Sequence, residues 1–192
     1  PAQTKALMTK PALKALLLMG TVLLASLSSP LVMGKGVYQS GPDFIADTFG
    51  RGADTAPKAK SLWLTAPIRQ RAAHIVGRPI AGLRIRYHQR ASKTAWILEE
   101  IGKEMPITIG IVVQDNKIER VKILAYRESR GGEVRYPAYT QQYVGAALSE
   151  NNKLNQSIDG ITGATLSMWA VNKVAALALY YHSHTQQPVS DL

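Results

Sequence analysis

Seven residues near the C-terminal end of the sequence combine a carboxylate, two hydroxyls and three small residues. They are Asp159-Gly-Ile-Thr-Gly-Ala-Thr165. The Ala-rich stretch from Thr165 to about Tyr181 has apolar residues at helical spacing, so we expect the motif to open a helix. A helix N-terminus presents unpaired N–H groups and the positive end of the helix dipole, which suit a phosphate. The same residues also fit an ordinary helix start with a threonine N-cap.

A second segment whose residues could contribute to a ligand site runs from Tyr126 to Arg135. Its sequence is YRESRGGEVR, and it follows an expected strand. Its two glycines, Gly131 and Gly132, allow the backbone to approach a planar ring closely. Arg130 or Arg127 would place positive charge beside such a ring. The alternative interpretation is a hairpin turn with an Arg/Glu pair on the surface.

The first segment resembles the flavinylation motif of the FMN-binding domain family, Asp-x-x-(Ser/Thr)-Gly-Ala-(Thr/Ser), at every position. In that family an extracytoplasmic flavin transferase joins FMN through its phosphate to the last hydroxyl. The family includes subunits of Rnf complexes and of sodium-translocating NADH:quinone reductase, and the exported domain of NosR-type membrane proteins. Residues 127–133 are similar to the Arg-Glu-Ser-Arg-Gly-Gly-Glu stretch of the NosR-like branch, in place of the His-Glu-Thr-Pro-Gly stretch of Rnf-type subunits.

The resemblance, which extends over roughly residues 80–181, implies FMN held covalently by a phosphoester to Thr165 and no catalytic residue in the polypeptide. Asp159 would serve recognition by the transferase, and the loop would lie against the flavin. The implied cofactor-binding residues are Asp159, Gly160, Thr162, Gly163, Ala164 and Thr165 in the motif, and Glu128, Ser129, Arg130 and Gly131 in the loop. Aromatic residues near the motif either stack on the ring or belong to the core, and these are Tyr139, Tyr143 and Trp169.

A sheet must position both segments, because alternating and β-branched runs fill residues 83–126. We expect strands at Leu83–Tyr87, Thr94–Ile101, Ile107–Val113 and Lys117–Tyr126, with a hairpin turn at Asp115-Asn116. We also expect helices over residues 58–76, bent or divided at Pro67, and over residues 139–148. The prediction is an α+β fold, a small and mainly antiparallel sheet packed by helices and preceded by one N-terminal transmembrane helix.

Residues 15–34 carry no charge and lie between Lys14 and Lys35. Their length suffices to span a hydrocarbon core of about 30 Å. Lys5, Lys10 and Lys14 precede the segment, so the positive-inside rule leaves the N-terminus in the cytosol. We expect a retained single-pass anchor in a bacterial inner membrane, with the main domain in the periplasm. The alternative is a signal peptide cleaved near residues 26–28.

The expected organisation is therefore a cytosolic N-terminus and anchor over 1–35, a basic juxtamembrane connector with a helix over 36–79, an FMN-binding domain over 80–182 and a tail over 183–192. The net charge of +10 is concentrated in residues 51–93, which hold ten Lys or Arg against one Asp. Because this block follows the apolar segment, lipid headgroups or an acidic redox partner are expected there, and nucleic acid is not. A solvated basic face is the alternative.

The sequence contains no cysteine, which excludes disulfides, thiolate zinc sites, iron–sulfur clusters and thioether-linked haem. Its four histidines form no metal-binding motif, so we expect no metal. The leading hypothesis is a membrane-anchored flavoprotein that relays electrons between membrane redox subunits holding quinone, haem or iron–sulfur centres. Two alternatives remain, a flavin-dependent reductase of a small extracytoplasmic substrate and a regulatory or scaffold subunit without a redox role.

Overall fold

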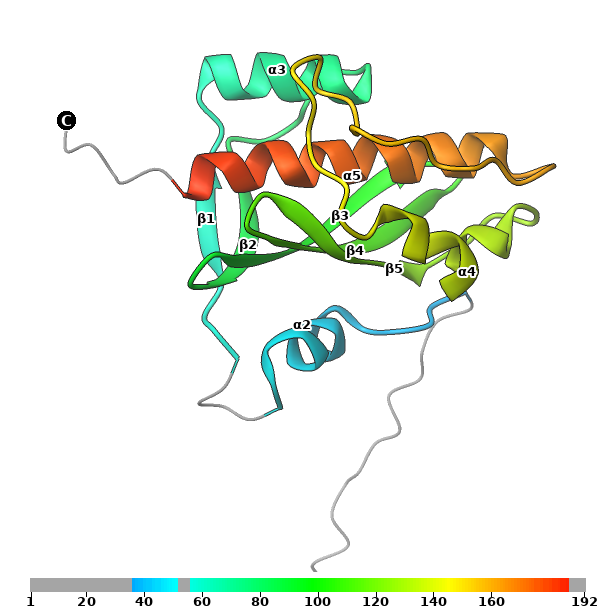
Figure 1. Ribbon diagram of the computed structural model, residues 1–192, viewed down its shortest axis with the longest axis horizontal. Coiled ribbons are helices and arrows are strands. Elements are labelled where there is room, and N and C mark those ends of the chain that lie inside the picture. The colour runs from blue at the N-terminus through cyan, green and yellow to red at the C-terminus, as the bar shows by residue number, and fades with distance from the viewer. Residues whose placement is uncertain (1–35, 52–55, 187–192) are drawn as a thin grey trace, which may run out of the picture. The chain divides into compact units, whose positions relative to one another are not determined.

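The computed structural model describes residues 36–51 and 56–186 (Figure 1). Its centre is a five-stranded antiparallel sheet in which strands consecutive in sequence are neighbours. The strands are β1 (Lys60–Trp63), β2 (Arg84–Arg90), β3 (Lys93–Ile101), β4 (Pro106–Gln114) and β5 (Lys117–Ala125). The helices are α2 (Gly41–Phe49), α3 (Ala66–Val76), α4 (Pro137–Thr140) and α5 (Thr165–Thr185), with 3-10 turns η1 (Gly132–Arg135) and η2 (Gln141–Tyr143). The predicted α+β class with an antiparallel sheet is confirmed.

The transmembrane segment expected at residues 15–34 lies outside the described residues. Within residues 36–51 and 56–186, no helix has both the length and the apolar character needed to cross a membrane.

Strand β4 lies inside the sheet, and its sequence is apolar on both faces. Its fully buried side chains are Ile107, Ile109, Ile111, Val112 and Val113. The turn to β5 places Asp115 and Asn116 at φ of 51° and 61°, the left-handed region that these two residue types tolerate best among those with a side chain. The hairpin expected at this dipeptide is confirmed.

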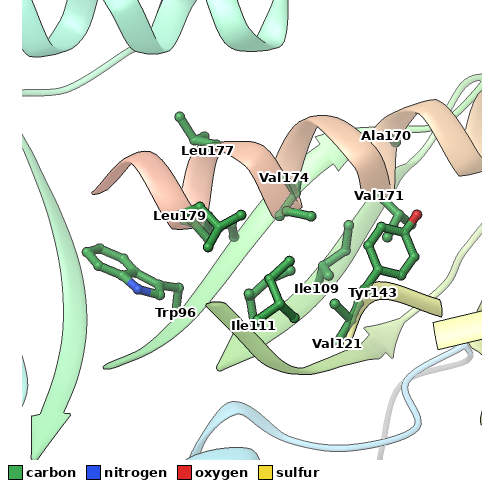
Figure 2. Close-up of a cluster of buried hydrophobic side chains, with 14 of the residues drawn as sticks. Trp96, Ile109, Ile111, Val121, Tyr143, Ala170, Val171, Val174, Leu177 and Leu179 are labelled. Carbon is green, nitrogen blue, oxygen red and sulfur yellow. The ribbon is translucent and has the colours of Figure 1, made fainter. Parts of the chain in front are cut away.

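Helix α5 packs along one face of the sheet and supplies much of the main core (Figure 2). Val171 and Val174 lie over Ile109 and Ile111. Burial of each such side chain contributes about 1.5–3 kcal/mol, so this contact fixes the position of α5 firmly. Because Thr165 is the first residue of α5, the core also determines where the predicted attachment site lies.

Helix α2 covers the opposite face of the sheet, and the sequence did not predict it. Its Phe44, together with Ile45 and Phe49, is buried against β3, β4 and β5. Ser40 caps the helix by accepting the Asp43 N–H at 3.2 Å. Gly110 makes room for the helix, since a Cβ there would lie 2.6 Å from the Phe44 ring. The connector expected over 36–79 therefore contains a helix that packs on the sheet.

The segment 36–79 thus contributes α2, β1 and α3 to the same compact unit as the residues that follow it. The helix expected over 58–76 is wrong in its first part, because Lys60–Trp63 pair with β2 as an edge strand. Pro67 does not bend α3 but lies in its first turn, where a missing N–H costs nothing.

The helix expected over 139–148 is shorter than predicted and ends at Tyr143. Gly145, at φ 83°, turns the chain so that its N–H reaches the Ile118 carbonyl at 2.8 Å. Helix α5, by contrast, is longer than predicted and continues to Thr185, beyond the end expected near Tyr181.

A buried histidine joins the far end of α5 to the hairpins of the sheet. His182 is fully buried, its Nδ1 lies 2.7 Å from Thr94 Oγ1, and its Nε2 accepts the Asn116 N–H at 3.4 Å. Because Nε2 accepts, the neutral ring carries its proton on Nδ1 and donates it to Thr94. Burial lowers the pKa of His182 to about 4, against a smaller opposing effect of Asp115.

This histidine predicts acid sensitivity. Between pH 6.5 and 4 this histidine binds a proton in the unfolded chain but stays neutral in the folded chain. The free energy of unfolding should therefore decrease as the pH is lowered, by about 3 kcal/mol in total. The His182→Gln variant should show little of this pH dependence of the free energy of unfolding. The His74→Gln variant, which changes an exposed histidine, should retain it. Urea unfolding at half-unit pH intervals measures the effect, and equal pH profiles for the two variants would contradict it.

Candidate functional site

The start of α5 has no side-chain cap. The N-cap residue is the buried Ala164, and Thr165 occupies the first helical position with an exposed side chain. Gly163, at φ 83°, turns the chain into the helix. The interpretation of the motif as an ordinary threonine N-cap is therefore wrong. The first N–H groups of a helix have no intrahelical partner, so this turn offers free donors beside an exposed hydroxyl.

The residues before the helix are held by backbone contacts that leave their side chains outward. The Asp159 N–H donates to Gln142 Oε1 at 2.7 Å, and Ile161 packs against the main core. Asp159, Gly160 and Thr162 are exposed. The motif thus presents its carboxylate and both hydroxyls to solvent, as a protein that modifies it would require.

The structure brings the loop after β5 directly against the first turn of α5. Gly131 is buried at φ 81°, and a Cβ there would lie 2.8 Å from Tyr126 Oη, 3.0 Å from Ser167 Oγ and 3.3 Å from Ala164 Cα. Tyr126 Oη also lies 2.8 Å from Ser167 Oγ and donates to the Arg130 carbonyl. The two segments that the sequence singled out are therefore neighbours.

Glu128 is held within the fold by hydrogen bonds to one of its carboxylate oxygens. Its Oε1 accepts the backbone N–H groups of Lys103, Glu104 and Met105 at 2.6, 2.7 and 2.9 Å. Although partial burial opposes ionisation, these three bonds and the Lys103 charge hold the pKa of Glu128 below its ordinary value. The carboxylate therefore fixes the turn between β3 and β4.

The two candidate cations of the loop differ in their contacts. Arg127 donates to the Pro106 carbonyl and to Thr108 Oγ1, both at 3.2 Å, so it is committed to β4. Arg130 is exposed, as is Ser129, and it forms no ion pair within the described part of the chain. Ser129 and Arg130 are thus the loop side chains that remain available to a ligand.

A hollow of about 460 Å³ opens over α5, between the segment that precedes the motif and Ile75 of α3. Trp169 lines it and is 54% exposed, although it is a large aromatic residue. Trp169 follows Thr165 by one helical turn, so both side chains lie on the same face of α5. Residues 152–154, residues 156–158 and Ile75 form the opposite wall.

The polar lining of this hollow includes residues that sequence reasoning missed, Asn172, Lys153 and Lys173. Asn172 is held by Tyr143, whose hydroxyl donates to Asn172 Oδ1 at 2.5 Å. Asn172 and Lys173 follow Thr165 at helical spacing, so the sequence could have identified them as neighbours of the motif. No such spacing identifies the residues of the opposite wall.

The other aromatic residues near the motif belong to the core. Tyr139 and Tyr143 are buried and lie with their hydroxyls 2.7 Å apart. Burial raises the pKa of Tyr139 to about 12, and that of Tyr143 still further, so both hydroxyls remain protonated. Of the three aromatic candidates for stacking, only Trp169 is accessible.

A smaller hollow of about 240 Å³ lies at the loop itself, bordered by Arg130, Arg135 and three tyrosines. The Arg135 guanidinium lies over the rings of Tyr38 and Tyr136, at 5.0 and 4.9 Å from their centroids. It also donates to both hydroxyls, at 2.9 and 3.1 Å. This arrangement ties the first described residues to the loop.

Comparison with protein families places the loop and the motif within one matched region. Residues 102–180 match the family model of the FMN-binding domain. The matched region begins at the turn held by Glu128, includes the loop and the motif, and ends within α5. No curated protein matches the chain.

The close approach at Gly131 predicts a specific loss of stability. Ala in the left-handed region costs about 1 kcal/mol, and at Gly131 its Cβ would also collide with Tyr126 and Ser167, for a total near 3 kcal/mol. Gly77→Ala is the matched control, because Gly77 has φ 76° and open space around its Cβ. Urea denaturation of both variants gives the comparison, and equal losses would show that the contact with α5 contributes nothing.

Proposed function

Because residues 102–180 belong to the FMN-binding domain family, we propose that this chain carries FMN on the Thr165 hydroxyl and relays electrons outside the cytosol. The observation that carries the proposal is the start of α5, where an exposed threonine opens a helix without a side-chain cap. A phosphate esterified to Thr165 Oγ1 would find free N–H donors and the positive end of the helix dipole in the same turn.

Covalent attachment suits a carrier outside the cytosol, where FMN is not dependably supplied. The ester keeps the cofactor beside the protein at a high effective concentration. When bound, FMN supplies one- and two-electron transfer. Thr165 holds the group and takes no part in that transfer.

The hollow over α5 fits a planar ring next to this attachment point. Its volume of about 460 Å³ is within the range of ordinary ligand pockets. Trp169 offers an exposed aromatic face one turn from Thr165. Lys153 and Lys173 would stabilise negative charge that develops on a reduced ring. Asn172, fixed by Tyr143, has an amide N–H₂ left to donate.

The loop residues contribute in two ways. Gly131, with Tyr126, positions the first turn of α5, and Glu128 holds the neighbouring turn. Ser129 and Arg130 are exposed beside this turn and would provide a hydroxyl and a charge to the cofactor. Asp159 and Thr162, also exposed, would be read by the transferase.

The partners that follow are a flavin transferase for maturation and membrane subunits that hold quinone, haem or iron–sulfur centres. The uncharged residues 15–34 would anchor the chain in a bacterial inner membrane, with the N-terminus in the cytosol. Support for the outer location comes from the lysines before that segment.

Substitution of the attachment residue tests the central claim. The chain co-expressed with a flavin transferase should give a fluorescent flavin band on a denaturing gel, Thr165→Val should abolish it, and Thr165→Ser should retain it because a hydroxyl remains. A colourless wild-type band would favour the regulatory or scaffold hypothesis. A band that survives Thr165→Val would place the bond elsewhere.

A second substitution tests the position of the ring. An indole stacked on a flavin quenches its emission, so native, flavin-loaded Trp169→Leu should be several-fold more fluorescent than the wild type. Trp63→Leu is the matched control, because Trp63 is 62% exposed but lies on β1. Unchanged emission of Trp169→Leu, with flavin still on the denatured chain, would remove the ring from this hollow.

A further inference from the structure

Four large exposed hydrophobic side chains gather around the point where the described chain begins. The described residues include nine such side chains, and the four in question are Tyr38, Ile101, Met105 and Tyr136, with exposed fractions of 46, 49, 43 and 50%. We call these four the aromatic rim. We propose that the aromatic rim rests in the interface of the lipid bilayer and turns the Thr165 end of the domain toward the membrane. This inference rests on the anchor included in the proposed function.

Three segments of the chain meet at the aromatic rim. Gly36 O accepts the Tyr126 N–H at 2.8 Å, and Tyr38 is joined to Tyr136 through Arg135. Glu128 links this loop to the turn that carries Ile101 and Met105, through its bond to the Met105 N–H at 2.9 Å. The rim is thus built into the fold from residues distant in sequence.

The position of the rim follows from chain connectivity. The uncharged stretch ends at Gly34, and only Lys35 separates it from Gly36. One extended residue spans at most about 3.6 Å. If residues 15–34 span the bilayer, Gly36 must lie at the membrane surface. The side chains around Gly36 are then the ones that meet lipid, whatever the rest of the domain faces.

The chemistry of the rim suits a lipid interface. Tyrosines concentrate at headgroup depth, where an apolar ring and a polar hydroxyl are both accommodated. Ile101 and Met105 are exposed apolar side chains without a polar group. A turn that faces only water has no need of such side chains. The same segments hold four basic side chains, Lys103, Arg127, Arg130 and Arg135. Of these, the exposed Arg130 forms no ion pair within the described residues and is available to a lipid phosphate.

An acidic protein is a poorer fit to this surface. Three carboxylates, those of Glu104, Glu128 and Glu133, stand among the four basic groups in the same segments, so the net positive charge is small. A partner recognised mainly by charge would gain little there. Exposed apolar area is the feature that distinguishes the rim from the surrounding surface.

The rim and the attachment site lie at one end of the domain. The first turn of α5 contacts Gly131, which is in the loop next to the rim. In Figure 1 the start of α5 and the blue beginning of the described chain lie at the same end of that helix, whereas β1 lies at the other. A docked rim would therefore present a cofactor on Thr165 to partners within the membrane.

Single cysteines give a direct test, because the chain has none of its own. The full-length chain carrying Met105→Cys or Ile101→Cys would be labelled with an environment-sensitive dye and reconstituted in nanodiscs of phosphatidylcholine and phosphatidylglycerol. The dye should be quenched by lipid-borne nitroxide and shielded from aqueous iodide roughly twofold or more relative to controls, as expected for interfacial depth. The matched controls are Leu83→Cys and Trp63→Cys, at sites that are 64 and 62% exposed and lie beside β2 and on β1.

The outcomes separate this inference from the proposed function. Rim labels that behave like the controls, in a chain that resists alkaline extraction and carries flavin, would overturn docking alone. Shielding from iodide without quenching by lipid would assign the rim to a protein or a second copy of the chain and would also overturn it. Release of the chain by alkaline extraction would refute the anchor and docking together, and loss of flavin with normal lipid quenching would refute only the cofactor.

Discussion

The contact of Gly131 with the first turn of α5 is the constraint on which the site depends. A backbone without a side chain at φ 81° lets the loop after β5 pack so closely that an added Cβ would lie only 3.3 Å from Ala164 Cα. Tyr126 and Ser167 complete the contact with a hydrogen bond. Because α5 is also seated on the sheet by its buried valines and alanines, its first residue is held from two sides. Thr165 is therefore an exposed group on a rigid base.

The two faces of the sheet divide the work of the domain. One face bears α5, the hollow and Tyr143, which holds Asn172. The other is closed by α2 in a separate core around Phe44. Buried hydrogen bonds connect both ends of α5 to the sheet. His182 bonds Thr94 at the far end, and Tyr126, which follows β5, bonds Ser167 in the first turn. Such fixed surroundings suit a cofactor site, since little of the protein must rearrange when charge on a bound ring changes.

Much of the fold could be predicted because strands and the last helix carry strong local patterns. The strands after residue 83, the Asp115-Asn116 hairpin and the start of α5 at Thr165 were found from periodicity and turn chemistry. Helix α2 and strand β1 were missed. Their segments are short, and what decides their structure is burial on a sheet formed by later residues: Phe44 fits over Gly110, and Leu62 pairs with Ile85.

The sequence by itself supplied the motif, and the resemblance of that motif identified Thr165 as the residue proposed to carry FMN. It also supplied the match of residues 102–180 to the model of the FMN-binding domain. Only the tertiary structure decided what surrounds Thr165. It assigned Glu128 to a backbone turn, Tyr139 and Tyr143 to the core and Trp169 to an open hollow, and it gathered the aromatic rim from three segments. The physical reason is that residue type and spacing fix local conformation and chemistry, whereas exposure and proximity arise from contacts between residues far apart in the chain.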